Sequence, residues 1–400
     1  MFQPRAVQTL AAIPRSTRRL GAAAVAALAV AAGPAAANAM ADDGAVYTQT
    51  NDPAGNAVQK FDRARDGGLT PAGTFPTGGV GLADLGGRQG AVELSDDEDT
   101  VYAVNTGSNS VTAFRVPDDD DDDDDGRSDD DDGRSDDRDA GLEIVGTVAS
   151  GGVAPASVDE HRGRVYVLNS GGVPNVTAFS VGRRGALTPI PGGARDLPGA
   201  DGAAQVSVTP DGRRLVVSER VSNRLETLAL DRRGRPGEPV ITASSGTTPF
   251  GFAISRRGHV LVSEAGTNSV SSYSIGSSGL LGVITPALAA NQGGVCWLAV
   301  SPDARFAYTG NAGGGGSISG FAVDRHGSLT ALDADGRTAV PALSPRDLDF
   351  ARNGRFVYAV SPGSSTTGGL VTGYRVERDG SLTEITSAPA AVGITGAAAG

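Results

Sequence analysis

The chain has 400 residues, a net charge of −12 and a single cysteine, Cys296, which excludes a framework of internal disulfides. Glycine is abundant, with 58 residues, and aromatic residues make up only 5%, as in chains of many short strands. Residues 118–139 hold fifteen Asp and three Arg, a charge of −12, and residues 1–39 carry four arginines. The rest of the chain, without these two segments, has a net charge of only −4. We therefore expect no nucleic-acid partner.

Residues 1–41 have the pattern of a cleaved export signal. Residues 1–21 are basic and contain no acidic residue, and the apolar run 22–33 is too short to cross a bilayer. Small residues before Met40 and around Ala41 offer cleavage sites. An uncleaved anchor helix is the alternative. We expect an extracellular, periplasmic or cell-envelope protein that has no membrane span after signal removal and is a monomer.

Residues 42–400 repeat one pattern seven times. Each unit has an apolar run, a turn such as PDGR, a segment like VYxxN, a Gly/Ser/Asn loop and a segment like SVxxF. The segments centre on Tyr47, Tyr102, Tyr166, Val216, Leu261, Tyr308 and Tyr358. A period of about 45–50 residues with four strand signals predicts an all-β fold, a single seven-bladed β-propeller.

The first unit lacks its inner strand, and the chain ends in a strand-like run. We expect residues 391–398 to supply that strand, so that the N- and C-terminal strands share blade 1 and close the ring. A frayed tail is the alternative reading of the same residues.

The Asp-rich segment 118–139 falls between the third and fourth strands of blade 2. We expect a disordered, self-repelling loop. The alternative is weak Ca²⁺ binding, since Asp121, Asp123, Asp125 and Asp132 match the first, third, fifth and twelfth positions of an EF-hand loop. We expect no other cofactor.

In a propeller the inner strands begin, and the second strands end, on one face near the axis, where ligand sites are usual. The residues expected to bind substrate there are Gln205, Arg220, Phe250, Trp297, Asn311, Arg346 and Asp347. Trp297 could stack on a ligand or pack between blades. The three histidines, His161, His259 and His326, fall in turns on the opposite face.

Two carboxylates end the second strands of adjacent blades on the expected ligand face. Glu219 in blade 4 and Glu264 in blade 5 could form an acid/base pair, and Arg224 could act with them. The alternative is that each carboxylate accepts loop hydrogen bonds or pairs with a nearby arginine.

The segments SVTPDGRRLVVSERVSNRLETLAL, LAVSPDARFAYTGN and FAVDRHGSLTAL resemble the lactonase-like seven-bladed propellers. That family includes 6-phosphogluconolactonases and 3-carboxy-cis,cis-muconate lactonising enzymes, and the VY repeats are also similar to the YVTN repeats of surface propellers. The resemblance implies a pocket of His, Glu and Arg. Glu219 and Arg224 match its fourth-blade motif, whereas the histidine is absent, because none occurs between His161 and His259.

Two functions follow from the resemblance. The first is hydrolysis or isomerisation of a small lactone or anionic carbonyl compound, with Glu and Arg in place of the usual His. The second is a secreted or surface-associated binding propeller without catalysis.

Overall fold

The structure is a computed structural model that describes residues 44–82, 88–117 and 141–400. The expected export signal and the Asp-rich insert lie outside these residues. In the described part, seven antiparallel sheets of four strands each account for the seven sequence units, which confirms the all-β seven-bladed propeller.

The sheets, here called blades 1 to 7, follow the chain order. Blades 1 to 3 contain β1 Ala45–Gln49, β2 Ala57–Arg63, β3 Leu69–Pro76 and β28 Thr395–Ala399; β4 Val92–Leu94, β5 Thr100–Asn105, β6 Ser110–Arg115 and β7 Glu143–Ala149; and β8 Val153–Glu160, β9 Arg164–Gly171, β10 Asn175–Val181 and β11 Leu187–Asp196. Two short 3₁₀ helices, η1 Thr106–Ser108 and η2 Arg183–Gly185, lie in connections of blades 2 and 3.

Blades 4 to 7 have the same order without helices. They contain β12 Ala203–Val208, β13 Arg214–Glu219, β14 Arg224–Leu230 and β15 Pro236–Ala243; β16 Pro249–Ile254, β17 Val260–Glu264, β18 Ser269–Ile275 and β19 Leu281–Ala289; β20 Val295–Val300, β21 Phe306–Asn311, β22 Ser317–Val323 and β23 Leu329–Ala331; and β24 Asp347–Phe350, β25 Phe356–Ser364, β26 Gly368–Val376 and β27 Leu382–Ala390.

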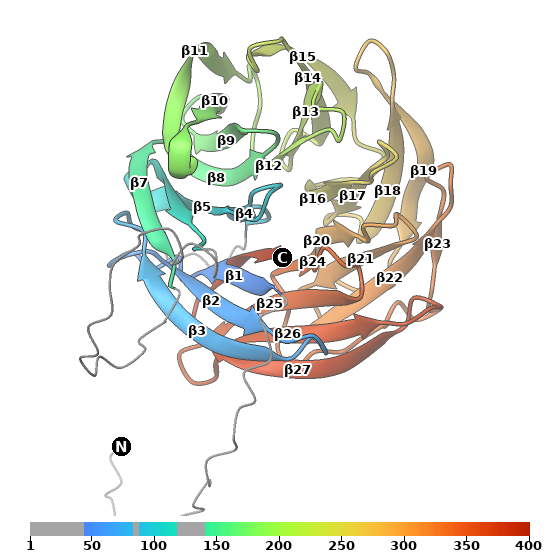
Figure 1. The fold of residues 1–400 in the computed structure, drawn as a ribbon. Helices are drawn as coiled ribbons and strands as arrows, with labels where there is room; N and C mark the ends of the chain where they lie inside the picture. Colours follow the sequence, from blue (N-terminus) through green and yellow to red (C-terminus); the bar gives the residue numbers. More distant parts are fainter. Residues whose placement is uncertain (1–43, 83–87, 118–140) are drawn as a thin grey trace, which may run out of the picture. The chain divides into compact units, whose positions relative to one another are not determined.

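The inner strands close a ring around the propeller axis (Figure 1), and a cavity of about 220 Å³ lies between them. Contacts run from β4 to β8, β12, β16, β20 and β24 in turn, then from β24 to β28 and from β28 back to β4. A closed ring leaves no blade with an uncovered face, so seven sheets that would each be marginal alone can bury both faces.

The C-terminal strand completes blade 1, as the sequence predicts. Strand β28 pairs antiparallel with β1, with Tyr47 opposite Ala398, and the Gly400 N–H donates to the Ala45 carbonyl at 2.9 Å. The strand begins at Thr395 rather than at residue 391, because the chain first turns through Gly393, whose φ is +81°. The prediction of a shared first blade is confirmed.

The core consists of layers between neighbouring blades. One cluster joins Trp297 and Tyr308 of blade 6 to Leu348 and Phe350 of blade 7, and Tyr308 is fully buried. The Tyr308 hydroxyl donates to the Gly380 carbonyl at 2.7 Å, in the β26–β27 turn of the next blade. The recurring tyrosine of the repeat therefore supplies both buried area and a hydrogen bond between blades.

The inner turns hold glycine where the backbone has positive φ. Gly212 and Gly258 have φ of +68° and +81°, values that a residue without a Cβ adopts at little cost. In the described part of the chain, no helix is long and apolar enough to cross a membrane.

Candidate functional site at the channel mouth

Four of the predicted substrate-binding residues meet at the ends of the inner strands. The rings of Phe250 in β16 and Trp297 in β20 make an edge-to-face contact at 5.7 Å between centroids. The Arg220 guanidinium lies 5.1 Å from the centre of the Phe250 ring, and that of Arg346 lies 5.5 Å from the Trp297 ring. We call Arg220, Phe250, Trp297 and Arg346 the mouth cluster; it draws on blades 4 to 6 and the start of β24.

Two donors of the mouth cluster have no partner among the described residues. The Nε of Arg346 and the Nε1 of Trp297 are both buried and make no hydrogen bond. Buried donors without a partner are rare and costly in folded proteins. Two of them in one cluster mark a place where hydrogen-bonding capacity is left unused inside the protein.

Cys296 lies next to the mouth cluster but is not a reactive thiol. Burial raises the pKa of its thiol to about 11, and the charges of Arg346 and Arg220 offset only part of this effect. The nucleophilic thiolate is therefore scarce at neutral pH. The proximity of both arginines to one sulfur also places them on the same side of the channel.

Gln205 and Asp347 lie deeper, in the channel itself. They line a cavity of about 220 Å³ between the inner strands. The Gln205 amide donates to the Phe252 carbonyl at 2.9 Å and accepts from the Phe252 N–H at 2.7 Å. Asp347 accepts from the backbone of Leu348 and Ala397 at 2.8 and 3.1 Å. Both side chains thus bind the inner strand of the next blade.

The channel also contains carboxylates that the sequence analysis did not select. Glu93 of β4, Asp159 of β8 and Asp349 of β24 line the same cavity as Asp347. Asp159 accepts from the Val208 N–H of the next blade, and Asp349 accepts from Ala399 at 3.0 Å. The sequence signal that could have identified these carboxylates is an acidic residue within an otherwise apolar inner strand, such as the segment DLDF of β24.

Burial perturbs this group of acids. It raises the pKa of Asp159 and Asp349 to about 7, and neighbouring carboxylates add to the effect at Asp159. The pKa values of Glu93 and Asp347 are raised well above the usual range for the same reason. Near neutral pH the channel therefore holds protons that free carboxylic acids would have released.

Glu219 is fully buried in an ion-pair network on the blade-3 side of blade 4. The Arg224 Nε lies 2.6 Å from the Glu219 Oε2, and the other end of the guanidinium lies 2.9 Å from Glu226. Ser222 also donates to Glu219, and Arg224 donates to the Pro198 carbonyl at 3.1 Å. Burial and the Glu219 carboxylate raise the pKa of Glu226 to about 8. Glu226 is a member of this network that sequence reasoning missed.

Glu264 is fully buried in a separate network in blade 5. Its two oxygens accept from Ser269 and Ser271 at 3.0 and 2.8 Å, and from the Gly246 N–H at 2.7 Å. Ser244 and the Tyr273 hydroxyl complete the set at 2.8 and 3.2 Å. The structure gives Glu219 and Glu264 no common partner and does not bring them together as a pair.

The equivalent residues of other blades make the same kind of bonds. Asn105 donates to Ser110 and Thr112, and Asn311 donates to Ser317 and Ser319, all within 3.2 Å. This position thus joins the second strand to the start of the third in each of these blades. Asn311 was predicted to bind substrate, but its amide group donates to Ser317 and Ser319 instead. Catalytic roles for Glu219, Glu264 and Arg224 stay predictions.

All three histidines lie in turns away from the mouth cluster. His161 follows β8, His259 follows β16 and His326 follows β22, and His161 pairs with Asp96 at 3.0 Å. Within the described ranges, no group of three or more His, Cys, Asp or Glu residues is arranged to hold a metal ion. The Ca²⁺ hypothesis concerns Asp121, Asp123, Asp125 and Asp132. These residues lie outside the described ranges, so the hypothesis stays a prediction.

Comparisons with known proteins agree with this architecture. The family model described as "Lactonase, 7-bladed beta-propeller" matches residues 175–297 and 283–395. A putative 6-phosphogluconolactonase from Bacteroides fragilis superposes with a TM-score of 0.69 at 16% identity, over 90% of this chain and 98% of that one. A periplasmic gluconolactonase from Pseudomonas aeruginosa gives 0.66 at 17% identity, over 89% and 98%. No curated protein matches the chain in sequence.

Proposed function

Because the chain belongs to the lactonase family of seven-bladed β-propellers, we propose that its channel mouth binds an anionic sugar lactone and hydrolyses it. The ligand class follows from the relatives whose names specify 6-phosphogluconolactone or gluconolactone as substrates. The mouth cluster supplies two arginines for a carboxylate or phosphate. The buried rings of Phe250 and Trp297 support these arginines by cation–π contact.

The observation that carries this proposal is the pair of buried, unpartnered donors, Arg346 Nε and Trp297 Nε1. A site built to hydrogen-bond an oxygen of its ligand leaves such donors free when the ligand is absent. The Arg346 guanidinium can hold an anionic group by two parallel hydrogen bonds, and the indole N–H can hold a hydroxyl or ring oxygen.

The reaction adds water to the lactone carbonyl and breaks the ring C–O bond. The developing oxyanion would be stabilised by the Arg220 guanidinium, while Arg346 holds the anionic group. The ring oxygen leaves with a proton, and the product is a hydroxy acid whose carboxyl group releases one proton to solvent. Glu219 and Glu264 are occupied by structural bonds, so we assign proton acceptance from the attacking water to solvent hydroxide. The turnover number should then rise with pH rather than reach a plateau near pH 7.

The second candidate function is ligand binding without turnover. It is supported by the burial of Glu219 and Glu264 in structural networks and by the positions of the three histidines in turns away from the mouth cluster. Export of the mature protein remains part of both proposals. N-terminal sequencing of the secreted form tests it, with a start at Met40 or Asp42 as the expected result.

The test uses the fluorescence of Trp297, the only tryptophan. We expect 6-phosphogluconolactone or 6-phosphogluconate to change it saturably, and Arg346→Gln to weaken binding at least tenfold. Arg355→Gln is the matched control, because Arg355 lies over the buried Phe356 at 5.1 Å outside the mouth cluster. Proton release on ring opening, followed with an indicator dye, separates hydrolysis from binding alone. Equal binding by both variants would refute the mouth site.

A further inference from the structure

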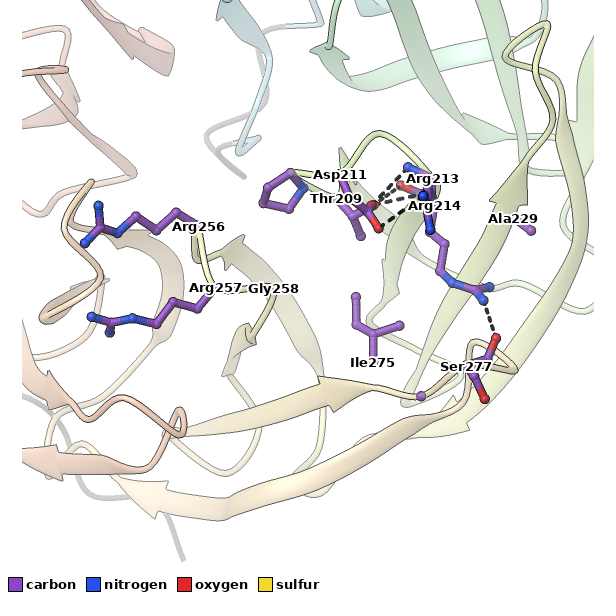
Figure 2. A pocket seen from close by; sticks show the side chains of 12 residues that line it. Thr209, Asp211, Arg213, Arg214, Ala229, Arg256, Arg257, Gly258, Ile275 and Ser277 are labelled. Atoms are coloured by element: carbon purple, nitrogen blue, oxygen red, sulfur yellow. Dashed lines mark hydrogen bonds and ion pairs between the residues drawn. The ribbon is translucent and has the colours of Figure 1, made fainter.

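A second concave site lies on the opposite face, between blades 4 and 5 (Figure 2). It is a groove of about 570 Å³, within the range of small-molecule sites. Its walls are the β12–β13 turn, the β16–β17 turn and the chain that follows β18. Pro210, Ala229 and Ile275 supply its apolar surface.

Arginine dominates the charge of this groove. Arg213, Arg214, Arg256 and Arg257 line it together with a single acid, Asp211, which leaves a net charge of +3. The Asp211 carboxylate is already used within its own turn, where it accepts from the Thr209 hydroxyl at 2.6 Å and from the Arg213 N–H at 3.1 Å.

The excess positive charge arises because blade 5 has an arginine at a turn position where other blades have an aspartate. Asp97, Asp211 and Asp303 each accept a hydrogen bond from a hydroxyl two residues earlier in the inner turn, at 2.5 to 2.6 Å. In blade 5 the residue two after Ser255 is Arg257, and Arg256 precedes it. A structural carboxylate is therefore replaced by a cation where blade 5 meets blade 4.

Two of the four guanidinium groups are fixed by the protein. Arg214 donates to the Ser277 carbonyl at 2.6 Å, and Arg257 donates to the Ala304 carbonyl of blade 6 at 2.8 Å. Figure 2 shows Arg256 and Arg257 extending away from the side of the groove that carries Arg213 and Arg214.

The other two guanidinium groups are available. Arg256 is exposed and makes no hydrogen bond or ion pair in the described part of the chain. Arg213 has only a contact of 4.0 Å with Asp211, and both side chains are mostly exposed, so this pair adds little. These two long side chains can turn toward a ligand from opposite sides of the groove.

We propose that this groove binds a small molecule that carries two phosphate groups. Each phosphate has a charge of about −1.5 to −2 near pH 7 and matches the fork of one guanidinium. Arg213 and Arg256 would each hold one phosphate, while the apolar surface of Ile275 and Pro210 would contact the part that joins them. The site is separate from the mouth cluster, because the inner strands run from one face to the other.

The test is calorimetric titration of the full secreted chain with inorganic pyrophosphate at constant ionic strength. We expect saturable binding at least ten times tighter than that of orthophosphate, and a loss of at least tenfold in the variant R213A/R256A. The matched control is R232A/R233A, which removes the same charge from exposed side chains of the β14–β15 turn and lies outside the groove. Its pyrophosphate affinity should stay within twofold of that of the wild type.

Three outcomes would overturn the proposal. They are an absence of heat with pyrophosphate, equal losses in both variants, and binding of malonate as tight as that of pyrophosphate. The first removes the site, the second reduces it to general surface charge, and the third removes the preference for phosphate. Fluorescence of Trp297 with the lactone ligand should be unchanged in R213A/R256A, so this test is independent of the proposed hydrolysis.

Discussion

At the scale of single residues, the charged side chains of the inner strands act mainly between blades. Inner strands expose backbone N–H groups toward the channel, and Asp159, Asp347 and Asp349 accept hydrogen bonds from the next blade. A buried backbone N–H without an acceptor at such a position would lower the free energy of unfolding by on the order of 1–3 kcal/mol. The acids are retained in a low-dielectric channel because they satisfy these donors, and the raised pKa values are the consequence.

This arrangement predicts a pH dependence of stability. The pKa of Asp349 rises from 3.8 to about 7 on folding because the group is buried, so the folded protein holds this proton more tightly than the unfolded chain. The resulting stabilisation is complete below about pH 4 and is lost as the pH rises through 7.

We therefore expect Asp349→Asn, which cannot ionise, to reduce the fall in unfolding free energy between pH 5 and pH 8. The reduction should be on the order of 2 kcal/mol, measured by urea unfolding at both pH values. An equally steep or steeper fall in the variant would contradict the assignment.

Glu264 gives a second test at this scale. Replacing it with Gln puts an amide NH₂ at one of the two oxygens, so that it faces either the Gly246 N–H at Oε1 or the Ser269 and Ser271 hydroxyls at Oε2. We expect Glu264→Gln to lower the unfolding free energy by about 1–3 kcal/mol and to leave the rate of lactone opening within twofold. A stable variant that has lost turnover would instead support the acid/base role predicted from the sequence.

At the scale of secondary-structure elements, β28 is the part on which ring closure depends. It pairs with β1, its backbone donates to Asp347 and Asp349, and the Arg63 Nε donates to the Gly400 carbonyl at 3.0 Å. Loss of this strand would uncover the edge of β1 and faces of blades 1 and 7 together.

Deletion of residues 395–400 should lower the melting temperature by more than about 10 °C or abolish cooperative unfolding, as followed by circular dichroism. The control is deletion of residues 118–139. Strands β6 and β7 are paired as far as Arg115 and Glu143, so a shorter connection preserves their register and should shift the midpoint by less than about 3 °C. Similar shifts for both deletions would argue against closure by β28.

At the scale of the whole molecule, the repeat predicted the fold because its signals are local. Turns with glycine, alternating strands and a fixed period determine each blade. Because neighbouring blades have the same pattern, a closed ring is the arrangement in which every blade face is covered. The C-terminal strand was predicted because the first unit lacked one. Its start was four residues out, since one glycine, Gly393, forms a turn there.

The site was predicted in part. Arg220, Phe250, Trp297 and Arg346 come together because strand ends converge at the axis, which follows from topology alone. Partners across blades do not follow from topology. The sequence left open whether Glu219 acts with Glu264 as an acid/base pair or pairs with a nearby arginine, and the structure shows it paired with Arg224.

The central claim is that an anionic sugar ligand binds at the mouth cluster, and its most direct test is a crystal structure of the protein with 6-phosphogluconate. We predict an anionic group of the ligand within hydrogen-bond distance of the Arg346 Nε, with the indole N–H of Trp297 bound to a ligand oxygen. A ligand found elsewhere on the propeller, or a mouth that stays empty at saturating concentration, would contradict the account.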